Sequence, residues 1–176
     1  MTIEAEVSVP TPGVQIEPNS HRPWGEKWCA ALRALAALEE AYATRLDSAE
    51  TEDRAKRVFN ELNDMRDWLL GDTPPSVHAS DITDYYDNEP RLEVTEAVAN
   101  TYKHHTRTKK NVPTAKIGKI VFPPGATAGA LVTIAVTYPT GSSRADRAED
   151  ALASALEAVA AWRDFFKKHN IDEPSC

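Results

Sequence analysis

Residues 24–46 read WGEKWCAALRALAALEEAYATRL, and their apolar spacing indicates an amphipathic helix. Apolar side chains recur every three or four positions at Trp24, Trp28, Ala31, Leu32, Leu35, Leu38, Tyr42 and Leu46. Side chains at this spacing share one face of a helix, and that face needs a partner to cover it. We therefore expect a helix that begins after Pro23 and ends near Asp47.

The following stretch repeats this pattern and predicts a second helix that packs against the first as a helical hairpin. Ser48 or Thr51 marks its start, Gly71 and Pro74-Pro75 stop it, and its stripe is Ala55, Val58, Phe59, Leu62, Met65 and Leu69. The acidic segment 72–90 is expected to be a loop with at most a short helical turn. It lacks the central Gly and terminal Glu of a calcium-binding loop, so we expect no metal site there. A third helix is expected after Pro90, with Pro113 as its outer limit.

Two strand-like runs, 116–122 and 131–138, predict a β-hairpin at about residues 115–139. A last helix is expected from about Ser143, which would cap it, with a stripe at Leu152, Ala155, Leu156, Val159, Trp162 and Phe166. The fold class is therefore mainly α: a four-helix bundle with a β-hairpin inserted between the third and fourth helices. Residues 1–22 are expected to be a flexible arm, and 23–172 one domain.

The composition indicates a single-domain protein without a membrane-spanning segment. The chain has 176 residues, 41% of them hydrophobic, which suffices for one core. No apolar run approaches the roughly 20 residues that cross a bilayer, and no export signal is visible, so we expect a cytoplasmic protein. Cys29 lies inside a helical pattern and Cys176 is the last residue, a poor arrangement for a disulfide framework or a metal site, so both are expected to be structurally incidental. A hairpin is marginal alone, so its apolar face packs on the bundle or on another subunit, and we expect a homo-oligomer, a dimer.

Charge is distributed unevenly along the chain. Residues 97–145 contain no Asp or Glu but seven basic residues, so this stretch has a net charge of +7. Because the net charge of the whole chain is −7, the remaining residues have a net charge of −14 (−7 minus +7). This asymmetry predicts a surface that faces RNA or an acidic protein partner, formed by Lys103, Arg107, Lys109, Lys110, Lys116 and Lys119. The alternative is that these lysines decorate a sheet edge and discourage aggregation.

One cluster in this region carries usable chemistry. Asn100, Lys103, His104 and Arg107 are spaced i, i+3, i+4 and i+7, so they share one face of the expected third helix. Cations can hold a phosphodiester while His104 moves the proton, and this chemistry needs no metal or cofactor. The alternative is that Asn100 and His104 are polar residues satisfied at a helix boundary.

Asp67-Trp68-Leu69 followed by Asn100-x-x-Lys103-His104 resembles the HEPN group of helical bundles, over about residues 55–107. The resemblance implies a metal-independent RNase, or an inactive nucleotide- or RNA-binding relative, in a bacterial or phage conflict system. Active members carry Arg, then four to six residues, then His. Ala99 stands where that Arg would precede Asn100, whereas the final helix holds Arg163-Asp164-x4-His169. The candidate catalytic residues are therefore His104, Asn100, Arg163 and His169.

Two other classes of function remain open. The first is a noncatalytic protein–protein interaction module that uses the basic region 103–119. The second is an assembly protein whose amino-terminal arm orders on association. The chain has no Gly-rich phosphate loop and no G-x-S-x-G elbow, which argues against an ordinary metabolic enzyme. Whether the protein is an enzyme is left undecided by the sequence.

Overall fold

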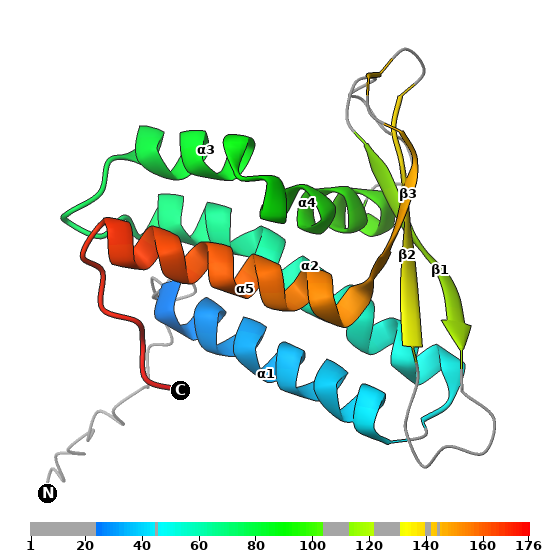
Figure 1. The fold of residues 1–176 in the computed structure, drawn as a ribbon. Coiled ribbons are helices and arrows are strands. Elements are labelled where there is room, and N and C mark those ends of the chain that lie inside the picture. The colour runs from blue at the N-terminus through cyan, green and yellow to red at the C-terminus, as the bar shows by residue number, and fades with distance from the viewer. Residues whose placement is uncertain (1–23, 45, 104–112, 122–130, 140–141, 144) are drawn as a thin grey trace, which may run out of the picture.

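The computed structural model describes residues 24–176 except 45, 104–112, 122–130, 140–141 and 144. The described residues form five helices and three strands (Figure 1). The helices are α1 (Trp24–Ala43), α2 (Ser48–Gly71), α3 (Ala79–Asn88), α4 (Pro90–Lys103) and α5 (Ala151–Lys168). The strands are β1 (Thr114–Val121), β2 (Leu131–Thr137) and β3 (Arg147–Asp150). The predicted mainly α fold is confirmed, while the predicted arm 1–22 lies outside the described residues.

Helices α1 and α2 form the expected helical hairpin and supply much of the core. Most of their predicted stripes are buried, with Trp28, Leu38, Phe59 and Leu62 fully inaccessible to solvent. α1 ends at Ala43 and not near Asp47, so Leu46 lies outside the helix. The cap of α2 is Asp47, whose carboxylate accepts a hydrogen bond from the Glu50 backbone N–H at 2.9 Å. Neither Ser48 nor Thr51 is the cap, because Ser48 is already the first residue of the helix and Thr51 follows it in the first turn.

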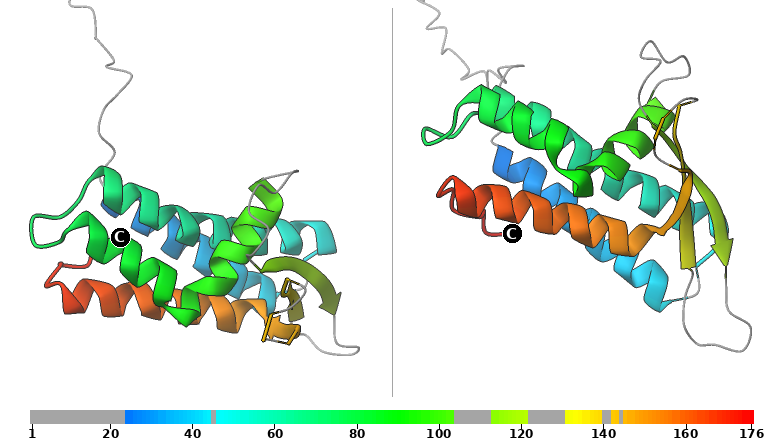
Figure 2. Two further views of the ribbon diagram at one scale, coloured as in Figure 1. Left: turned by 90° about the horizontal axis from the view of Figure 1, so that it is seen from above. Right: turned by 45° about the horizontal axis from the view of Figure 1, so that its top comes forward.

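Helix α3 occupies the segment that was expected to be a loop. Its Ile82 and Tyr86 are buried and stand four positions apart, so they face the core together. The Asp81 carboxylate accepts from the backbone N–H of His78 at 2.9 Å, which satisfies a donor at the start of the helix. The chain changes direction between α3 and α4 (Figure 2), where Glu89 takes the extended backbone that a residue before proline favours.

The small sheet also differs from the prediction. It has three antiparallel strands in the order β1-β2-β3, whereas the sequence predicted a two-stranded hairpin followed directly by helix. Residues 147–150, expected to be helical, pair with β2, and α5 begins only after them. Asp150 caps α5 by accepting from the Ala153 backbone N–H at 2.9 Å, so Ser143 is not the cap. Five helices and three strands thus stand where four helices and a hairpin were expected.

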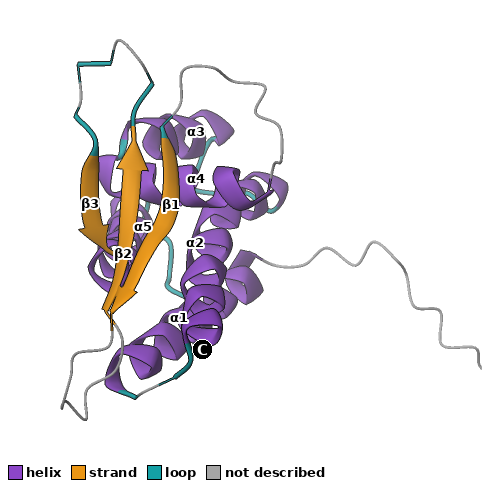
Figure 3. Cartoon of the chain, turned by 90° about the vertical axis from the view of Figure 1, so that its right-hand side faces the viewer, coloured by secondary structure: helices purple, strands orange, loops and turns teal. Residues whose placement is uncertain are grey.

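One face of the sheet packs on the helices and the other does not. The inward side chains Ala115, Val132, Ile134 and Val136 are buried in the common core. No described helix covers the opposite face (Figure 3), where Lys116, Leu131, Ala135 and Thr137 are exposed. The sheet therefore presents an open face at one end of the bundle. Among the described helices, none is long and apolar enough to cross a bilayer.

The prediction that both cysteines are structurally incidental is wrong. Cys29 in α1 and Cys176 form a disulfide with an S–S distance of 2.05 Å across 147 residues of sequence. The chain reverses after α5 because Asn170 adopts a positive φ of 52° and the Ile171 N–H donates to the Phe166 carbonyl at 2.9 Å. This helix-ending turn sends residues 171–176 back along α1, so cysteines that are remote in sequence meet.

Candidate functional site

The Asn100 cluster is described only in part. Asn100 is half-buried on α4, and its amide donates to the Glu96 carboxylate at 3.4 Å. Lys103 is the last residue of α4, and its side chain is not described. His104, Arg107, Lys109 and Lys110 lie outside the described residues.

Arg163 and His169 have other partners in the structure. Arg163 donates to both carboxylate oxygens of Glu173 at 3.0–3.2 Å, and its guanidinium lies 5.9 Å from the centroid of the Trp28 ring. The His169 ring packs on Phe165 with centroids 4.4 Å apart, and its Nε2 is buried without a hydrogen-bond partner. Arg163 lies in the last two turns of α5 and His169 directly follows that helix, whereas Asn100 lies near the end of α4, the helix whose end adjoins β1. The structure therefore does not bring Asn100 together with Arg163 and His169.

Lys116 and Lys119, in contrast, are brought to the same face of the sheet. Residues three apart on a regular strand point to opposite faces. Here the register is irregular between Ile117 and Lys119, so Lys116 pairs with Ala135 and Lys119 pairs with Thr133, two residues of one face. Gly118 is the extra residue of this β-bulge. Both lysines are exposed on the face that no described helix covers.

The β2 neighbours of these lysines are uncharged. The same face carries small or short side chains at Thr133, Ala135, Thr137 and Ala148, with Leu131 half exposed at one end. Among the described residues this face has no aromatic side chain, and its acidic residue, Asp150, belongs to the opposite edge strand. We call Lys116, Lys119 and these neighbours on β2 and β3 the open face.

Tyr102 connects the end of α4 to the edge of β1. Its hydroxyl accepts a hydrogen bond from the Ile117 backbone N–H at 3.2 Å, and the ammonium of Lys56 lies 4.7 Å from its ring centroid. An edge N–H that is bonded in this way is not available to another strand. Tyr102, an aromatic residue of the basic stretch, thus has a structural role.

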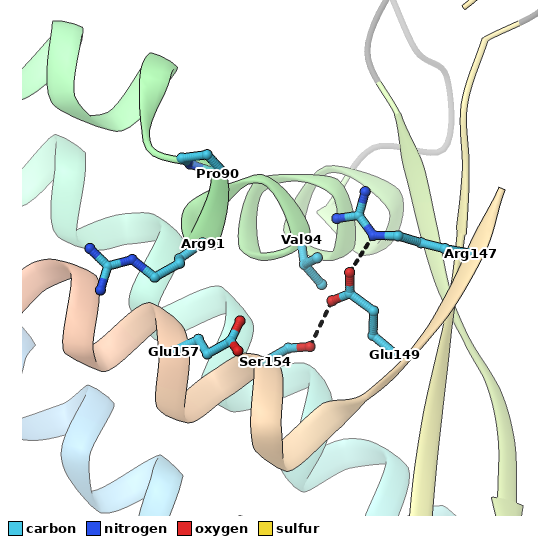
Figure 4. A pocket seen from close by; sticks show the side chains of 7 residues that line it. All are labelled: Pro90, Arg91, Val94, Arg147, Glu149, Ser154 and Glu157. Carbon is cyan, nitrogen blue, oxygen red and sulfur yellow. Dashed lines mark hydrogen bonds and ion pairs between the residues drawn. The ribbon is translucent and has the colours of Figure 1, made fainter. Parts of the chain in front are cut away.

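A polar pocket lies behind the sheet, between α4, β3 and α5 (Figure 4). Its volume is about 220 Å³, and it is lined by Pro90, Arg91, Val94, Arg147, Glu149, Ser154 and Glu157. Alternation along β3 aims Arg147 and Glu149 inward, and Asp150 starts α5 so that Ser154 lies in its first turn. The sequence did not single out these residues because it predicted helix at 147–150.

Ion pairs join the strands to the helices at this pocket. Arg147 contacts the carboxylate of Glu149 and the hydroxyl of Tyr138, and it reaches Glu93 of α4 at 3.3 Å. Tyr138 donates to Glu93 at 2.9 Å, and Ser154 donates to Glu149 at 2.8 Å. Partial burial lowers the pKa of Arg147, but bonding and attraction to its two carboxylate partners outweigh this and raise its pKa above the ordinary value.

The chemistry available in the pocket is limited. Arg91 is paired with Glu89 and Asp164, each at 2.8 Å, so both arginines of the lining are already neutralised by carboxylates. Ser154 has a carboxylate as its acceptor, and no described histidine lines the pocket. A serine nucleophile needs a neighbouring base of suitable pKa. The polar network therefore fastens β3 to α4 and α5.

The described residues contain no group of three or more His, Cys, Asp and Glu side chains placed to hold a metal ion. The chain matches no protein-family model, no curated protein and no solved structure.

Proposed function

We propose that this protein is a noncatalytic interaction module whose open face binds an acidic surface of another protein. The observation that carries the proposal is the bulge at Gly118, which places Lys116 and Lys119 on one exposed face. β-Bulges commonly re-aim side chains at sites of function. The described lysines also continue the basic region that begins at Lys103.

The composition of the open face favours a protein partner over single-stranded nucleic acid. Proteins that hold single strands stack the bases on aromatic side chains. The open face has no aromatic residue among those described, and Tyr102 is held by Lys56 and Ile117. The short Thr and Ala side chains of this surface let another protein approach closely, while two lysines on the edge strand supply the charge complementarity that selects an acidic partner.

Charge reversal tests this proposal. The Lys116→Glu/Lys119→Glu variant is compared with Lys167→Glu/Lys168→Glu, which makes the same change of net charge at the far end of α5. The probe is a poly-glutamate peptide, with binding followed by fluorescence anisotropy at low and moderate salt. We expect the sheet variant to lose at least about tenfold in affinity and the control to stay within about twofold.

Equal weakening in both variants would refute the proposal, since binding would then follow net charge alone. Absence of binding by the wild-type protein at low salt would refute it as well. Circular dichroism of both variants verifies that the fold is retained, because all four lysines are exposed.

A second candidate is the HEPN-like, RNA-related role in a bacterial or phage conflict system. It is supported by the position of Asn100 and Lys103 on α4, whose end adjoins β1, the strand that carries Lys116, through Tyr102. Cleavage of a mixed RNA pool in EDTA by the wild type, His104→Ala and Arg163→Ala tests it. This candidate requires cleavage by the wild type that is lost in a variant, whereas an intact RNA pool eliminates the RNase form.

A homodimer and a cytoplasmic location complete the proposal. Light scattering tests the dimer: a mass of one chain at micromolar concentration would count against it. The Lys116→Glu/Lys119→Glu variant separates a self-contact through the open face from binding of another protein, because only the former changes the mass of the protein alone.

A further inference from the structure

The segment after α5, residues 171–176, lies along α1, and we call it the strap. It begins where the helix-ending turn at Asn170 reverses the chain, and it ends at the disulfide to Cys29. Figure 1 shows this red segment returning across the end of the bundle where α1 begins. The strap is thus fixed at both of its ends.

Between these ends the strap touches the α1 surface at a few points. Glu173 accepts from the Trp28 indole N–H at 3.1 Å and from the Arg163 guanidinium at 3.0 Å. Pro174 packs so closely on Gly25 that a Cβ built there would meet the proline Cγ at 3.1 Å. Glycine at position 25 therefore makes room for the strap.

The strap covers an aromatic cluster. Trp28 is fully inaccessible to solvent, and its ring packs edge-on against Phe166 with centroids 5.0 Å apart. Trp24 packs on the same Phe166 ring at 5.1 Å and is half-buried. The indole N–H of Trp28 points to Glu173 of the strap, so removal of the strap opens this edge of the cluster to water.

The noncovalent contacts of the strap include one exposed ion pair beside the Trp28–Glu173 hydrogen bond and the packing of Ile171 on the core. The Arg163–Glu173 pair has both side chains accessible to solvent, and exposed ion pairs stabilise little. The disulfide is the covalent link between the strap and α1. Its sulfur atoms belong to an exposed residue, Cys176, and a half-exposed one, Cys29, so a thiol reagent can reach it.

We propose that the Cys29–Cys176 disulfide is a redox clasp: its reduction frees the strap and uncovers the Trp28 edge of the bundle while the fold stays intact. A dithiol supplies two electrons and two protons, the S–S bond breaks into two thiols, and the dithiol closes into its own disulfide. Exchange with an oxidised thiol reverses the step. Such exchange suits a reversible disulfide in a compartment with a thiol pool.

The test compares the chain of residues 1–176 before and after dithiothreitol, with thiols counted by mass. Exchange of the indole N–H of each tryptophan is followed by NMR, and assignment uses Trp28→Phe. We expect exchange at Trp28 to accelerate at least about tenfold on reduction. Trp162 is the internal control, because its indole N–H bonds to the Leu62 carbonyl at 3.2 Å within the core and should not respond.

The Cys176→Ser variant provides the constitutively open form, since the change is made at an exposed residue and leaves α1 untouched. It should show the fast Trp28 exchange of the reduced wild type and no response to dithiothreitol. Equal Trp28 exchange in the oxidised and reduced wild type would overturn the proposal. So would loss of helical circular dichroism on reduction, or failure of the disulfide to form in glutathione disulfide.

Discussion

Replacing Tyr42 by Phe removes one oxygen atom at the place where the bundle and the sheet are joined. The Tyr42 hydroxyl, at the end of α1, lies 2.8 Å from the carboxylate of Asp150 and accepts from the backbone N–H groups of Val132 at 3.0 Å and Leu152 at 3.3 Å. One side chain therefore connects α1 to the start of β2, the end of β3 and the first turn of α5. The Tyr42→Phe variant keeps the packing of the ring.

The loss of unfolding free energy in Tyr42→Phe depends on which groups lose their hydrogen-bond partner where water cannot replace it. Val132 is fully buried, so its N–H stays unsatisfied, which costs about 1–3 kcal/mol. Asp150 is exposed and Leu152 half-exposed, so water replaces the lost bond at both. We expect a loss of about 2 kcal/mol of unfolding free energy, which raises the unfolding equilibrium constant about 30-fold. For a chain of this size the melting temperature falls by about 4–8 °C.

Urea unfolding under nonreducing conditions, followed by tryptophan fluorescence, measures this change. The matched control is Tyr102→Phe, which removes the same atom from a hydroxyl that bonds the half-exposed Ile117 N–H. We expect the control to lose less than about 1 kcal/mol, because water reaches that N–H. A Tyr42→Phe loss no larger than that of the control would refute the argument that this hydroxyl fastens the sheet.

Two further predictions concern pH. Burial raises the pKa of Tyr42 to about 12 and also raises the pKa values of Tyr85 and Tyr86 above the ordinary one. The folded state holds these protons more tightly, so stability is fully present below the unfolded pKa of about 10 and is lost as pH rises above it. Urea unfolding at about pH 8 and about pH 10.5 measures the loss, which should be smaller in Tyr86→Phe than in the wild type. At the acid end, hydrogen bonding from Arg91 holds the pKa of Glu89 below its ordinary value, so its contribution is present above the unfolded pKa of about 4.3 and is lost as pH falls. Glu89→Gln should therefore destabilise the protein at neutral pH, and the difference from wild type should shrink as pH falls below about 4.3; a difference that does not shrink with falling pH would contradict the assignment.

Long periodic stripes made α1 and α2 predictable, whereas α3 and β3 depend on tertiary contacts. In α3 the buried pair Ile82 and Tyr86 is too short a stripe to stand out among acidic neighbours. In β3 the charged residues Arg147 and Glu149 resemble a helix surface, and they form a strand because β2 offers its edge and Glu93 and Ser154 offer partners. Glu93 is 54 residues from Arg147 in the sequence, so a local pattern does not reveal this partner.

The open face illustrates the same limit for the candidate site. The sequence marked Lys116 and Lys119 as basic and available, but regular alternation would have turned one of them inward. Gly118 between them was the available signal, because an isolated glycine within a strand pattern suggests a bulge. The disulfide had no comparable signal, since its formation depends on the turn at Asn170 that directs the strap to Cys29.

The open face and the strap lie at opposite ends of α1, so the proposed binding surface and the proposed redox site are far apart. Cys29 and Tyr42 are 13 residues apart on α1 (42 minus 29), which corresponds to about 20 Å of helix. The core between them contains fully buried rings, including Phe59, Trp162 and Phe165, in the close packing of a protein interior. Coupling between distant sites needs an element with two states that both sites bias. Opening the strap should therefore leave poly-glutamate binding at Lys116 and Lys119 unchanged, and a reduced protein with altered binding would show that the bundle itself has a second packing.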